Sequence, residues 1–335
     1  MQAVRGKRYF LAFFILVITL LFVSAEIILR GKGYPARSKV KERVPFFELD
    51  SVLCWKNKPG QYYWPGPQDK VTIWLDTSRA VQPEPRERKE SIVMLGGSYV
   101  FGWLIRDQET FIWKMQQEFP LIDLRNCGVC GYGTYQSLLF LRRLLASGPA
   151  PVLVVYGFDS SQEERNVASW NLLSFLMQAT DEVVDRKIED YFPYCSLGKE
   201  GSLREGRINL HSGWPFRNKL ATSSFLRDLY MQFARMRDTS SAQTVTKKLL
   251  LEMNKLCEEK GAKFAVALLD FREEEKSRYI RFFQEGSISF IDCINSEFTL
   301  MKSDTIQGGH PGAEINSHWA QCLGRYIRER IMLDK

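Results

Sequence analysis

The chain has 335 residues, of which 45% are hydrophobic and 13% aromatic, so it can bury a sizeable core. Its length suits one large domain or two small ones. The net charge of +7 is too small and too evenly spread to indicate a nucleic-acid-binding protein. We therefore expect no nucleic-acid partner.

The cysteines are odd in number and scattered, so they do not form the framework of a small disulfide-rich domain. The seven are Cys54, Cys127, Cys130, Cys195, Cys257, Cys293 and Cys322. Cys127 and Cys130 have the Cys-x-x-Cys spacing of a redox pair or half of a metal site. A second half is missing, and the chain has only three histidines. We expect no metal and no cofactor.

An apolar segment over 9–29 nears the roughly 20 residues that a membrane span requires. A cleaved signal peptide is the alternative, because small residues at 23–25 resemble a cleavage site. We favour an uncleaved transmembrane anchor, since the apolar pattern continues past that point. Basic residues flank it on both sides, over 1–8 and 30–44, so the positive-inside rule does not decide the orientation. The basic linker at 30–44 either lies on anionic headgroups or is simply solvated.

Residues 45–90 read as an extension of short strands and turns, with a strand at 71–76 and a polar connector at 79–90. Beyond it, apolar runs alternate with helical patterns. Strands are expected at 91–95, 121–126, 151–158, 262–270 and 287–293, and helices at 109–119, 135–148, 244–261 and 315–331. This alternation predicts βαβ units and a parallel sheet.

The alternation breaks between 167 and 243, where aromatic, polar and turn segments follow one another. We interpret this stretch as an insertion over the carboxyl edge of the sheet. Ligands bind at that edge in open α/β sheets. The insertion is therefore expected to shape the substrate site.

Ser98 follows directly on a predicted buried strand, in the sequence IVMLGGSYVFG. Gly96 and Gly97 allow a sharp turn there, which would expose the serine at the start of a helix. The segment is not a phosphate-binding P-loop, since it lacks the Gly-Lys-Ser/Thr ending. It also departs from the α/β-hydrolase elbow, because position 100 is Val rather than Gly. The glycines at 128–133 have GxxGxG spacing instead of the dinucleotide-binding GxGxxG.

A serine nucleophile requires a base, and the base must be oriented. The candidates are His211, His310 and His318. His211 falls in the insertion, and His318 falls on the last predicted helix. His310 lies in a turn-rich loop after the last predicted strand, which reaches the same edge of the sheet as Ser98. His310 is therefore the better candidate base.

Three blocks of the sequence resemble the SGNH (GDSL-like) hydrolases, over 91–330. The first is Gly96-Gly97-Ser98, where that family has Gly-Asp-Ser, and the second runs from Asn126 to Gly131. The third is His310-Pro311, shortly before the final helix. The segments EIILRGKGY and LCWKNKPG also resemble the membrane-anchored branch of the family.

The resemblance implies a flavodoxin-like three-layer α/β/α sandwich with a parallel sheet. It also implies Ser98 as nucleophile, His310 as base, and backbone N–H groups of Ser98 and Gly131 as oxyanion donors. Such donors are commonly worth roughly 10²–10³ in rate.

Two positions depart from the family pattern. The family has an oxyanion-binding Asn where this chain has Asp159, and a carboxylate there would repel the developing charge. The triad Asp, three residues before the histidine, is Gln307 here. Either Asp304 supplies the acid, or the site is a Ser–His dyad whose histidine is oriented by a backbone carbonyl. The charged residues at 163–166 read as a capped, salt-bridged helix start.

These observations suggest a membrane-anchored serine esterase that removes acyl groups, such as acetyl, from envelope carbohydrate or another small ester. An O-acyltransferase using the same serine is the first alternative. The second is a binding protein that kept the fold and lost catalysis. We expect a single-pass membrane protein whose catalytic domain lies outside the cytoplasm, with the cytoplasmic orientation as the alternative.

Overall fold

The computed structural model describes residues 2–34, 45–66, 68–84, 90–180, 191–209, 216, 219–294, 305–306 and 309–332. The chain forms two compact units. The larger comprises residues 44–169, 190–208 and 238–335, and the smaller comprises 1–43, 170–189 and 209–237. The stretch interpreted as an insertion is thus divided between the two units.

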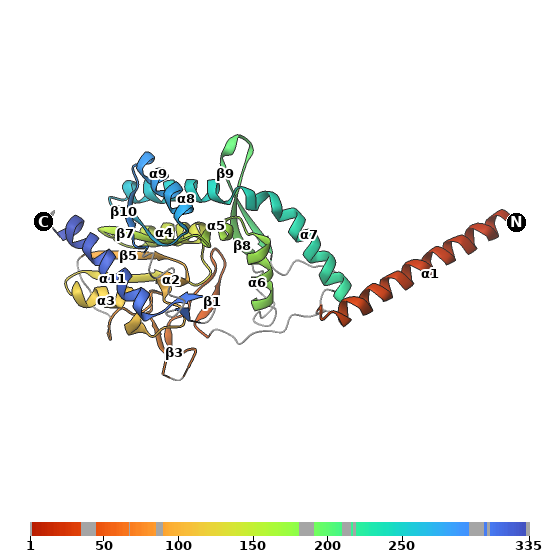
Figure 1. The fold of residues 1–335 in the computed structure, drawn as a ribbon, viewed down its shortest axis with the longest axis horizontal. Coiled ribbons are helices and arrows are strands. Elements are labelled where there is room, and N and C mark those ends of the chain that lie inside the picture. The colour runs from red at the N-terminus through yellow and green to blue at the C-terminus, as the bar shows by residue number, and fades with distance from the viewer. Residues whose placement is uncertain are drawn as a thin grey trace. The chain divides into compact units, whose positions relative to one another are not determined.

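The larger unit is built on a sheet of five parallel strands (Figure 1). Across the sheet they are ordered β11-β10-β7-β5-β6. Their bounds are β5 Ser91–Gly96, β6 Asp123–Gly128, β7 Leu153–Asp159, β10 Lys263–Asp270 and β11 Ser289–Asp292. In chain order this is the 2-1-3-4-5 arrangement of flavodoxin-like folds. The predicted parallel sheet and flavodoxin-like sandwich are confirmed.

The sheet is covered by helices on both faces because its strands alternate two sets of apolar side chains. Val93 and Leu95 of β5 share one core with the helices α4 Thr134–Ser147, α8 Ala242–Glu259 and α9 Glu273–Glu285. Ile92 and Met94 share the other core with α3 Phe111–Glu118 and α11 Ala313–Ile327. Apart from α9, each of these helices was predicted from the apolar spacing, within a few residues.

Residues 45–84 form two antiparallel hairpins ahead of the sheet. The first joins β1 Phe47–Asp50 to β2 Cys54–Asn57, and the second joins β3 Gly60–Tyr63 to β4 Lys70–Ile73. β4 is shorter than the strand expected at 71–76. Phe46, Val71 and Ile73 form a small core with Phe101, the last residue of the short helix α2 Ser98–Phe101. The extension thus packs directly on the segment that carries Ser98.

A third hairpin, β8 Tyr191–Leu197 with β9 Leu203–Asn209, packs against α4 and α8. A 3-10 turn at Lys199–Gly201 connects its strands. Cys195 of β8 is fully buried in the same core as α4 and α8. Phe192 of β8 stacks on Trp55 of β2 with ring centroids 5.9 Å apart. The hairpin therefore joins the helical layer to the N-terminal extension.

A disulfide connects Cys293, just after β11, to Cys322 on α11. The other cysteines form no disulfide, and those of the Cys-x-x-Cys pair lie at the end of β6 and in the loop after it. Burial raises the pKa of the Cys127 thiol to about 12 and also raises the pKa of Cys130. Both thiols therefore remain protonated near neutral pH, which argues against a redox role for this pair.

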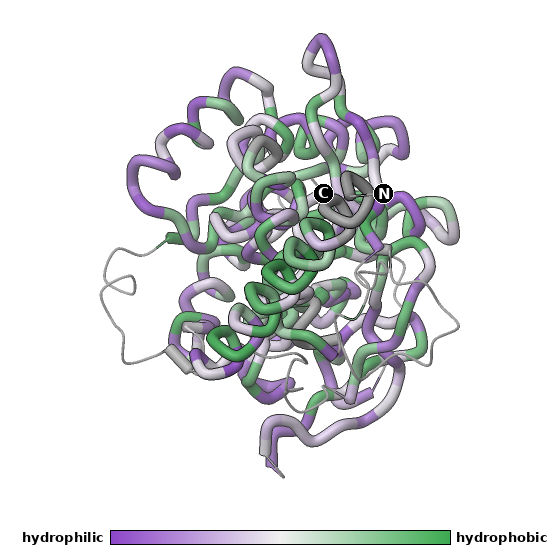
Figure 2. Tube along the Cα trace, turned by 90° about the vertical axis from the view of Figure 1, so that its right-hand side faces the viewer, coloured by the Kyte–Doolittle hydropathy of each residue, from purple (hydrophilic) through white to green (hydrophobic). Residues whose placement is uncertain are grey.

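The smaller unit contains α1 Gln2–Gly31, α6 Trp170–Thr180 and α7 Ala221–Ser240. The stretch Tyr9–Gly31 of α1 is long and apolar enough to cross a membrane, and none of it is buried. Hydrophobic residues follow one another along this helix (Figure 2). α1 is thus a candidate membrane anchor, in agreement with the span expected over 9–29.

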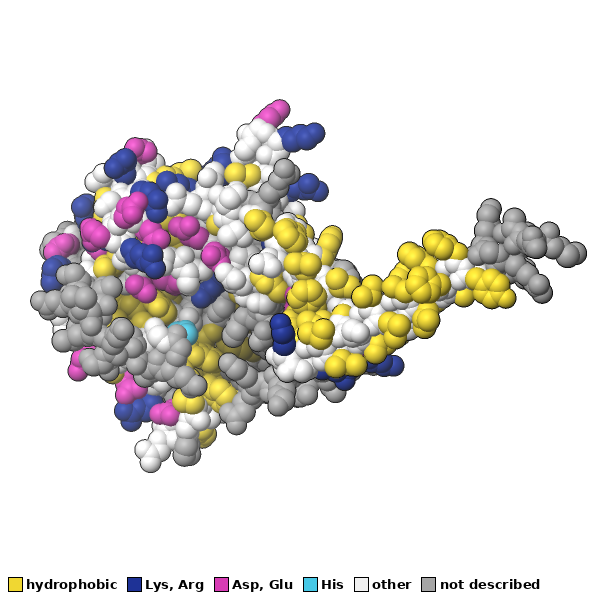
Figure 3. All heavy atoms as spheres, turned by 45° about the vertical axis from the view of Figure 1, so that its right-hand side comes forward, with side chains coloured by type: hydrophobic (Ala, Val, Ile, Leu, Met, Phe, Trp, Pro, Cys, Tyr) yellow, Lys and Arg dark blue, Asp and Glu magenta, His cyan; other side chains and the backbone are white. Residues whose placement is uncertain are grey.

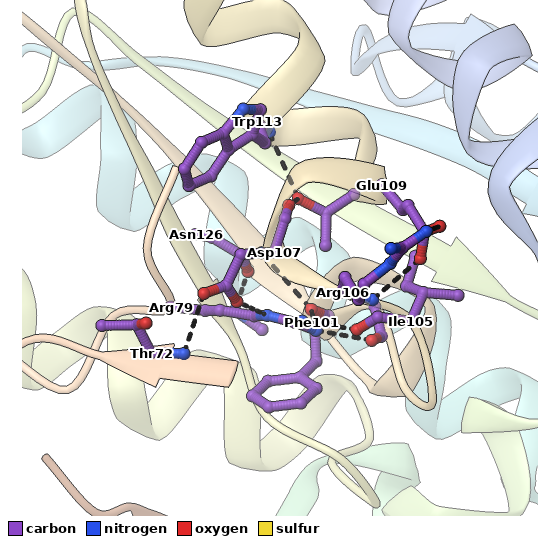
Figure 4. Close-up of polar contacts among 12 residues, drawn as sticks. Thr72, Arg79, Phe101, Ile105, Arg106, Asp107, Glu109, Trp113 and Asn126 are labelled. Carbon is purple, nitrogen blue, oxygen red and sulfur yellow. Dashed lines mark hydrogen bonds and ion pairs between the residues drawn. The ribbon is translucent and has the colours of Figure 1, made fainter. Parts of the chain in front are cut away.

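Arg79 is fully buried, which corrects the interpretation of residues 79–90 as a polar connector. Its guanidinium pairs with Asp107 at 2.9 Å and donates to the carbonyls of Phe101, Gly102 and Ile105 at 2.8, 2.5 and 2.6 Å (Figure 4). The second Asp107 oxygen accepts from the backbone N–H of Thr72 at 3.0 Å. The cation is tolerated in the interior because nearly all of its donors have a partner.

Replacing Arg79 by Ala should lower the free energy of unfolding by about 3–5 kcal/mol, because Asp107 would be left buried without its cation. Arg125→Ala is the matched control, since Arg125 forms a half-exposed ion pair with Asp76. That variant should lose less than about 1 kcal/mol. Chemical denaturation of the full chain in detergent measures both losses. Equal losses would contradict a special role for Arg79.

Candidate active site

Ser98 begins α2 immediately after β5, in a turn that requires glycine. Gly96 has a φ of +155°, and a Cβ there would lie 2.5 Å from Val100 Cγ2 and 2.7 Å from the Gly157 carbonyl oxygen. No side chain fits in that space, so the turn closes tightly on the neighbouring strand β7. Ser98 is only 5% exposed and projects from the carboxyl edge of the sheet.

His310 lies within hydrogen-bonding distance of Ser98, with 3.1 Å between Nε2 and Oγ. A general base must lie within about 2.6–3.2 Å of the proton it removes, and this pair meets that condition. Nδ1, on the other side of the ring, is buried. Asp304 and Gln307, the two positions considered for the acid, lie outside the described residues, as does His211.

Two helices fix the segment that carries His310. The His310 segment forms the short strand β13 His310–Pro311, which pairs with β12 Thr305–Ile306. Asn316 of α11 donates to the Gly312 carbonyl at 2.8 Å and accepts from the Phe111 N–H of α3 at 3.1 Å. Lys114 of α3 donates to the Ala313 carbonyl at 2.8 Å. His310 is thus held by both helices on one face of the sheet rather than by a free loop.

Aromatic rings surround the His310 imidazole. Tyr99 lies edge-on to it with ring centroids 5.8 Å apart, and Trp103 lies tilted at 6.3 Å. The Tyr99 hydroxyl donates to Asp270 at 3.2 Å. Burial raises the pKa of Tyr99, and the carboxylates of Asp159 and Asp270 raise it further. Tyr99 therefore stays protonated and keeps its hydrogen bond to Asp270.

The second block forms a loop against the end of β5. The Val129 N–H donates to the Gly96 carbonyl at 3.0 Å, which brings this loop beside the Ser98 turn. Gly131 has a φ of +83°, and a Cβ there would lie 2.9 Å from Trp55 Cζ2. Trp55 Nε1 in turn donates to the Cys130 carbonyl at 2.9 Å. The extension thus supports the loop that the resemblance assigns to the oxyanion.

Asp159 ends β7 with its carboxylate engaged by its own loop. It accepts from the backbone N–H of Ser161 at 3.1 Å, from the Ser161 hydroxyl, and from Gln162 Nε2 at 2.7 Å. In these contacts Asp159 is only an acceptor, whereas the amide at this position in the family donates. The three donors nevertheless hold it in a defined place next to the site.

Arg165 was interpreted from the sequence as part of a salt-bridged helix start, but its guanidinium faces the Ser98 turn. It lies on the short helix α5 Gln162–Asn166 and donates to the Tyr132 carbonyl at 3.0 Å and to the Ser161 hydroxyl at 2.9 Å. A Cβ at Gly97 would lie 3.1 Å from Arg165 Nη1. Arg165 therefore bonds to Tyr132, just after the second block, and to the loop after β7, and it lies beside the residue before Ser98.

The five strands in this order, with the sequence blocks at their carboxyl ends, define the fold. The chain has the flavodoxin-like α/β/α fold that its resemblance to the SGNH hydrolases implies. The hydrogen bond between Ser98 and His310 brings together two blocks of that resemblance that are 212 residues apart.

Solved structures of GDSL-type proteins and esterases are similar to the chain. A lipolytic protein of the G-D-S-L family from Veillonella parvula is 10% identical, with a TM-score of 0.40, and covers 72% of this chain and 98% of its own. A GDSL-like lipase from Bacteroides thetaiotaomicron is 15% identical, with a TM-score of 0.38 and coverage of 75% and 93%. A mutant acetyl-xylooligosaccharide esterase from Geobacillus is 12% identical, with a TM-score of 0.38 and coverage of 72% and 94%. No family model and no curated protein matches the chain. Likeness at this level assigns neither reaction nor substrate.

Arg165→Gln should slow the reaction of Ser98 with a fluorophosphonate probe by roughly 10²-fold, because small displacements of groups that position a reaction are costly. Arg142→Gln is the matched control, since Arg142 forms an exposed ion pair with Glu205 on the outside of α4. Its labelling rate should equal that of the unaltered chain. An unchanged rate in Arg165→Gln, with both variants folded by circular dichroism, would remove Arg165 from the site.

Proposed function

We propose that the protein is a membrane-anchored serine esterase that removes acyl groups, acetyl above all, from envelope carbohydrate. The hydrogen bond of 3.1 Å between Ser98 Oγ and His310 Nε2 is the observation that carries this proposal. The carbohydrate part rests on the resemblance of the anchor segment to the membrane-anchored branch of the family. The glycine turn before Ser98 and the well-anchored segment that carries His310 support a catalytic role for this serine rather than a purely structural one.

The proposed reaction proceeds through an acyl-enzyme. His310 Nε2 accepts the Ser98 proton as Oγ attacks the ester carbonyl, and the carbonyl oxygen becomes an oxyanion. Backbone N–H groups of Ser98 and Gly131 donate to that oxyanion. The C–O bond of the ester breaks, and the leaving alcohol takes the proton from His310. Water then attacks the acyl-enzyme, again with His310 as base, and releases the carboxylic acid and Ser98.

His310 must be held in the tautomer that presents an unprotonated Nε2 to Ser98. The proton then resides on Nδ1, which requires an acceptor on that side of the ring. Asp304 fills this role in one form of the proposal, and a backbone carbonyl fills it in the dyad form. The proposal assigns no donor role to Asp159, whose oxygens accept from Ser161 and Gln162.

The disulfide supports a catalytic domain outside the cytoplasm, since disulfides persist in oxidising compartments. Cys293 and Cys322 close a loop that contains the His310 segment. The candidate span over Tyr9–Gly31 supplies the attachment to the membrane. Together they favour an N-terminus in the cytoplasm and a hydrolase unit on the opposite side.

Fluorophosphonate labelling of the full chain in detergent tests the nucleophile. We expect the label on Ser98, with loss of labelling in Ser98→Ala and a severe loss in His310→Ala, because the hydroxyl is unreactive without its base. His318→Ala is the matched control and should label normally, since His318 lies on α11 away from the Ser98 contact. A folded, unaltered chain that takes up no label would favour the alternative of a binding protein without catalysis.

An O-acyltransferase would form the same acyl-enzyme, so only the acceptor separates it from a hydrolase. We expect an acetylated oligosaccharide to yield mainly free acetate when an unacetylated oligosaccharide is added as competing acceptor. Mass spectrometry of both sugars measures hydrolysis and transfer in one reaction, with Ser98→Ala as the blank. Transfer that exceeds hydrolysis would reassign the protein to the transferases.

A further inference from the structure

Helix α7 exposes a continuous apolar face. The large side chains on it are Phe225, Leu226, Leu229, Tyr230, Phe233 and Met236, each between 39% and 67% exposed. At 3.6 residues per turn they fall within an arc of about 140°. A helix that faces water carries its polar residues outward, and here most of the exposed residues are apolar.

The other side of α7 is polar. Arg227 and Asp228 form an ion pair of 2.8 Å there, and both are largely buried, as is Arg235 in part. A strongly amphipathic helix with an exposed face of Phe, Leu and Met is typical of segments that lie in a membrane interface. α7 therefore has the composition of an interfacial helix.

The beginning of α7 is bonded to the end of the candidate anchor α1. The Glu26 carboxylate of α1 accepts from the backbone N–H groups of Ala221 and Thr222, at 3.0 and 2.8 Å, and from the Thr222 hydroxyl at 2.6 Å. Arg30 donates to the Lys219 carbonyl at 2.8 Å. These bonds cap α7 and fix its first turn beside the last turns of α1.

A further contact between α7 and the end of α1 is formed by Tyr34. Its hydroxyl bonds to Asp228, and its ring packs edge-on against Phe225 at 5.7 Å. Arg30, Lys32 and Lys219 are exposed at this junction. Basic side chains at this level attract anionic headgroups.

We propose that α7 lies in the interface of the membrane that α1 enters, with its apolar face among the lipid headgroups and upper acyl chains. The inference rests on the proposed anchor, because the bonds from Glu26 and Arg30 place the first turn of α7 where α1 leaves the bilayer. Apolar side chains follow from α1 onto the neighbouring helix in the space-filling view (Figure 3). The protein then has two membrane contacts, a spanning helix and a helix lying in the interface.

Photocrosslinking of the full chain in nanodiscs of phosphatidylcholine and phosphatidylglycerol tests this inference. The photoreactive residue p-benzoylphenylalanine replaces Phe233 on α7, Phe14 on α1 or Leu251 on α8 in three separate variants. Leu251 is the matched control, since it is a 41% exposed apolar residue on a helix of the larger unit. Mass spectrometry of the tryptic peptides identifies the adducts. We expect lipid adducts at 233 and 14 but at least tenfold less at 251.

Adducts at 14 without adducts at 233 would overturn the inference and leave the anchor intact. Adducts at 233 to protein instead of lipid would overturn it in favour of a protein partner. Absence of lipid adducts at both positions would overturn the anchor and the inference together. Fluorophosphonate labelling of Ser98 in the same nanodiscs reports on the proposed esterase independently of these outcomes.

The bond between the helices has its own test. Glu26→Ala, combined with the photoreactive residue at 233, removes the cap of α7 and should reduce the lipid adduct severalfold, while the adduct at 14 stays unchanged. An unchanged adduct at 233 would overturn the role given to Glu26.

Discussion

The geometry of the nucleophile turn depends on one buried cation. The Arg79 guanidinium holds the carbonyls of Phe101, the last residue of the helix that begins with Ser98, and of Gly102 and Ile105 just after it. Its backbone N–H donates to the Asn126 carbonyl of β6 at 2.8 Å. Burying an arginine costs free energy unless its N–H donors have partners. Any movement of these carbonyls that breaks their bonds to Arg79 would therefore destabilise the fold. The N-terminal extension is therefore part of the site and not an appendage to the sandwich.

Small residues at the strand ends allow the helix α2 to approach the sheet. Gly96, Gly128 and Gly157 lie in register across the strands β6, β5 and β7. A Cβ at Gly128 would lie 2.3 Å from the Phe101 nitrogen, and one at Gly157 would lie 2.3 Å from Val100 Cγ2. Because α2 rests directly on these glycines, Ser98 comes close to the loops of both neighbouring strands. The same closeness allows a base from the far end of the chain to reach it.

The sheet, most of its helices and the Ser98–His310 pair could be predicted from the sequence, because strand ends and apolar spacing are local signals. The roles of Arg79, Trp55 and Arg165 could not be predicted in this way. The role of each depends on partners that are distant in sequence, such as Cys130, which lies 75 residues after Trp55. A short stretch of sequence around each residue shows only a charge or an aromatic ring. Arg79 in particular reads as solvated in its polar surroundings, whereas its partners come from a loop more than 20 residues later. The exposed apolar face of α7 could not be predicted either, because the sequence pattern over 167–243 is irregular.

At the position of Asp159 the SGNH hydrolases have an asparagine. Whether the proposed site works with this change depends on the charges around it. An oxyanion that forms near Asp159 and Asp270 is repelled by both carboxylates. Burial raises the pKa of Asp270, and the Tyr99 hydroxyl donates to this carboxyl group. Arg165 adds a positive charge that lies beside the Ser98 turn and bonds to Tyr132, the residue after the second block. The Arg165 charge is fixed in place before the reaction. In the proposed mechanism it counteracts the repulsion between the two carboxylates and the oxyanion, where electrostatic stabilisation contributes most to the rate. In the proposed reaction Arg165 thus offsets the loss of one amide donor, and the contact between Ser98 and His310 supplies the nucleophile and its base.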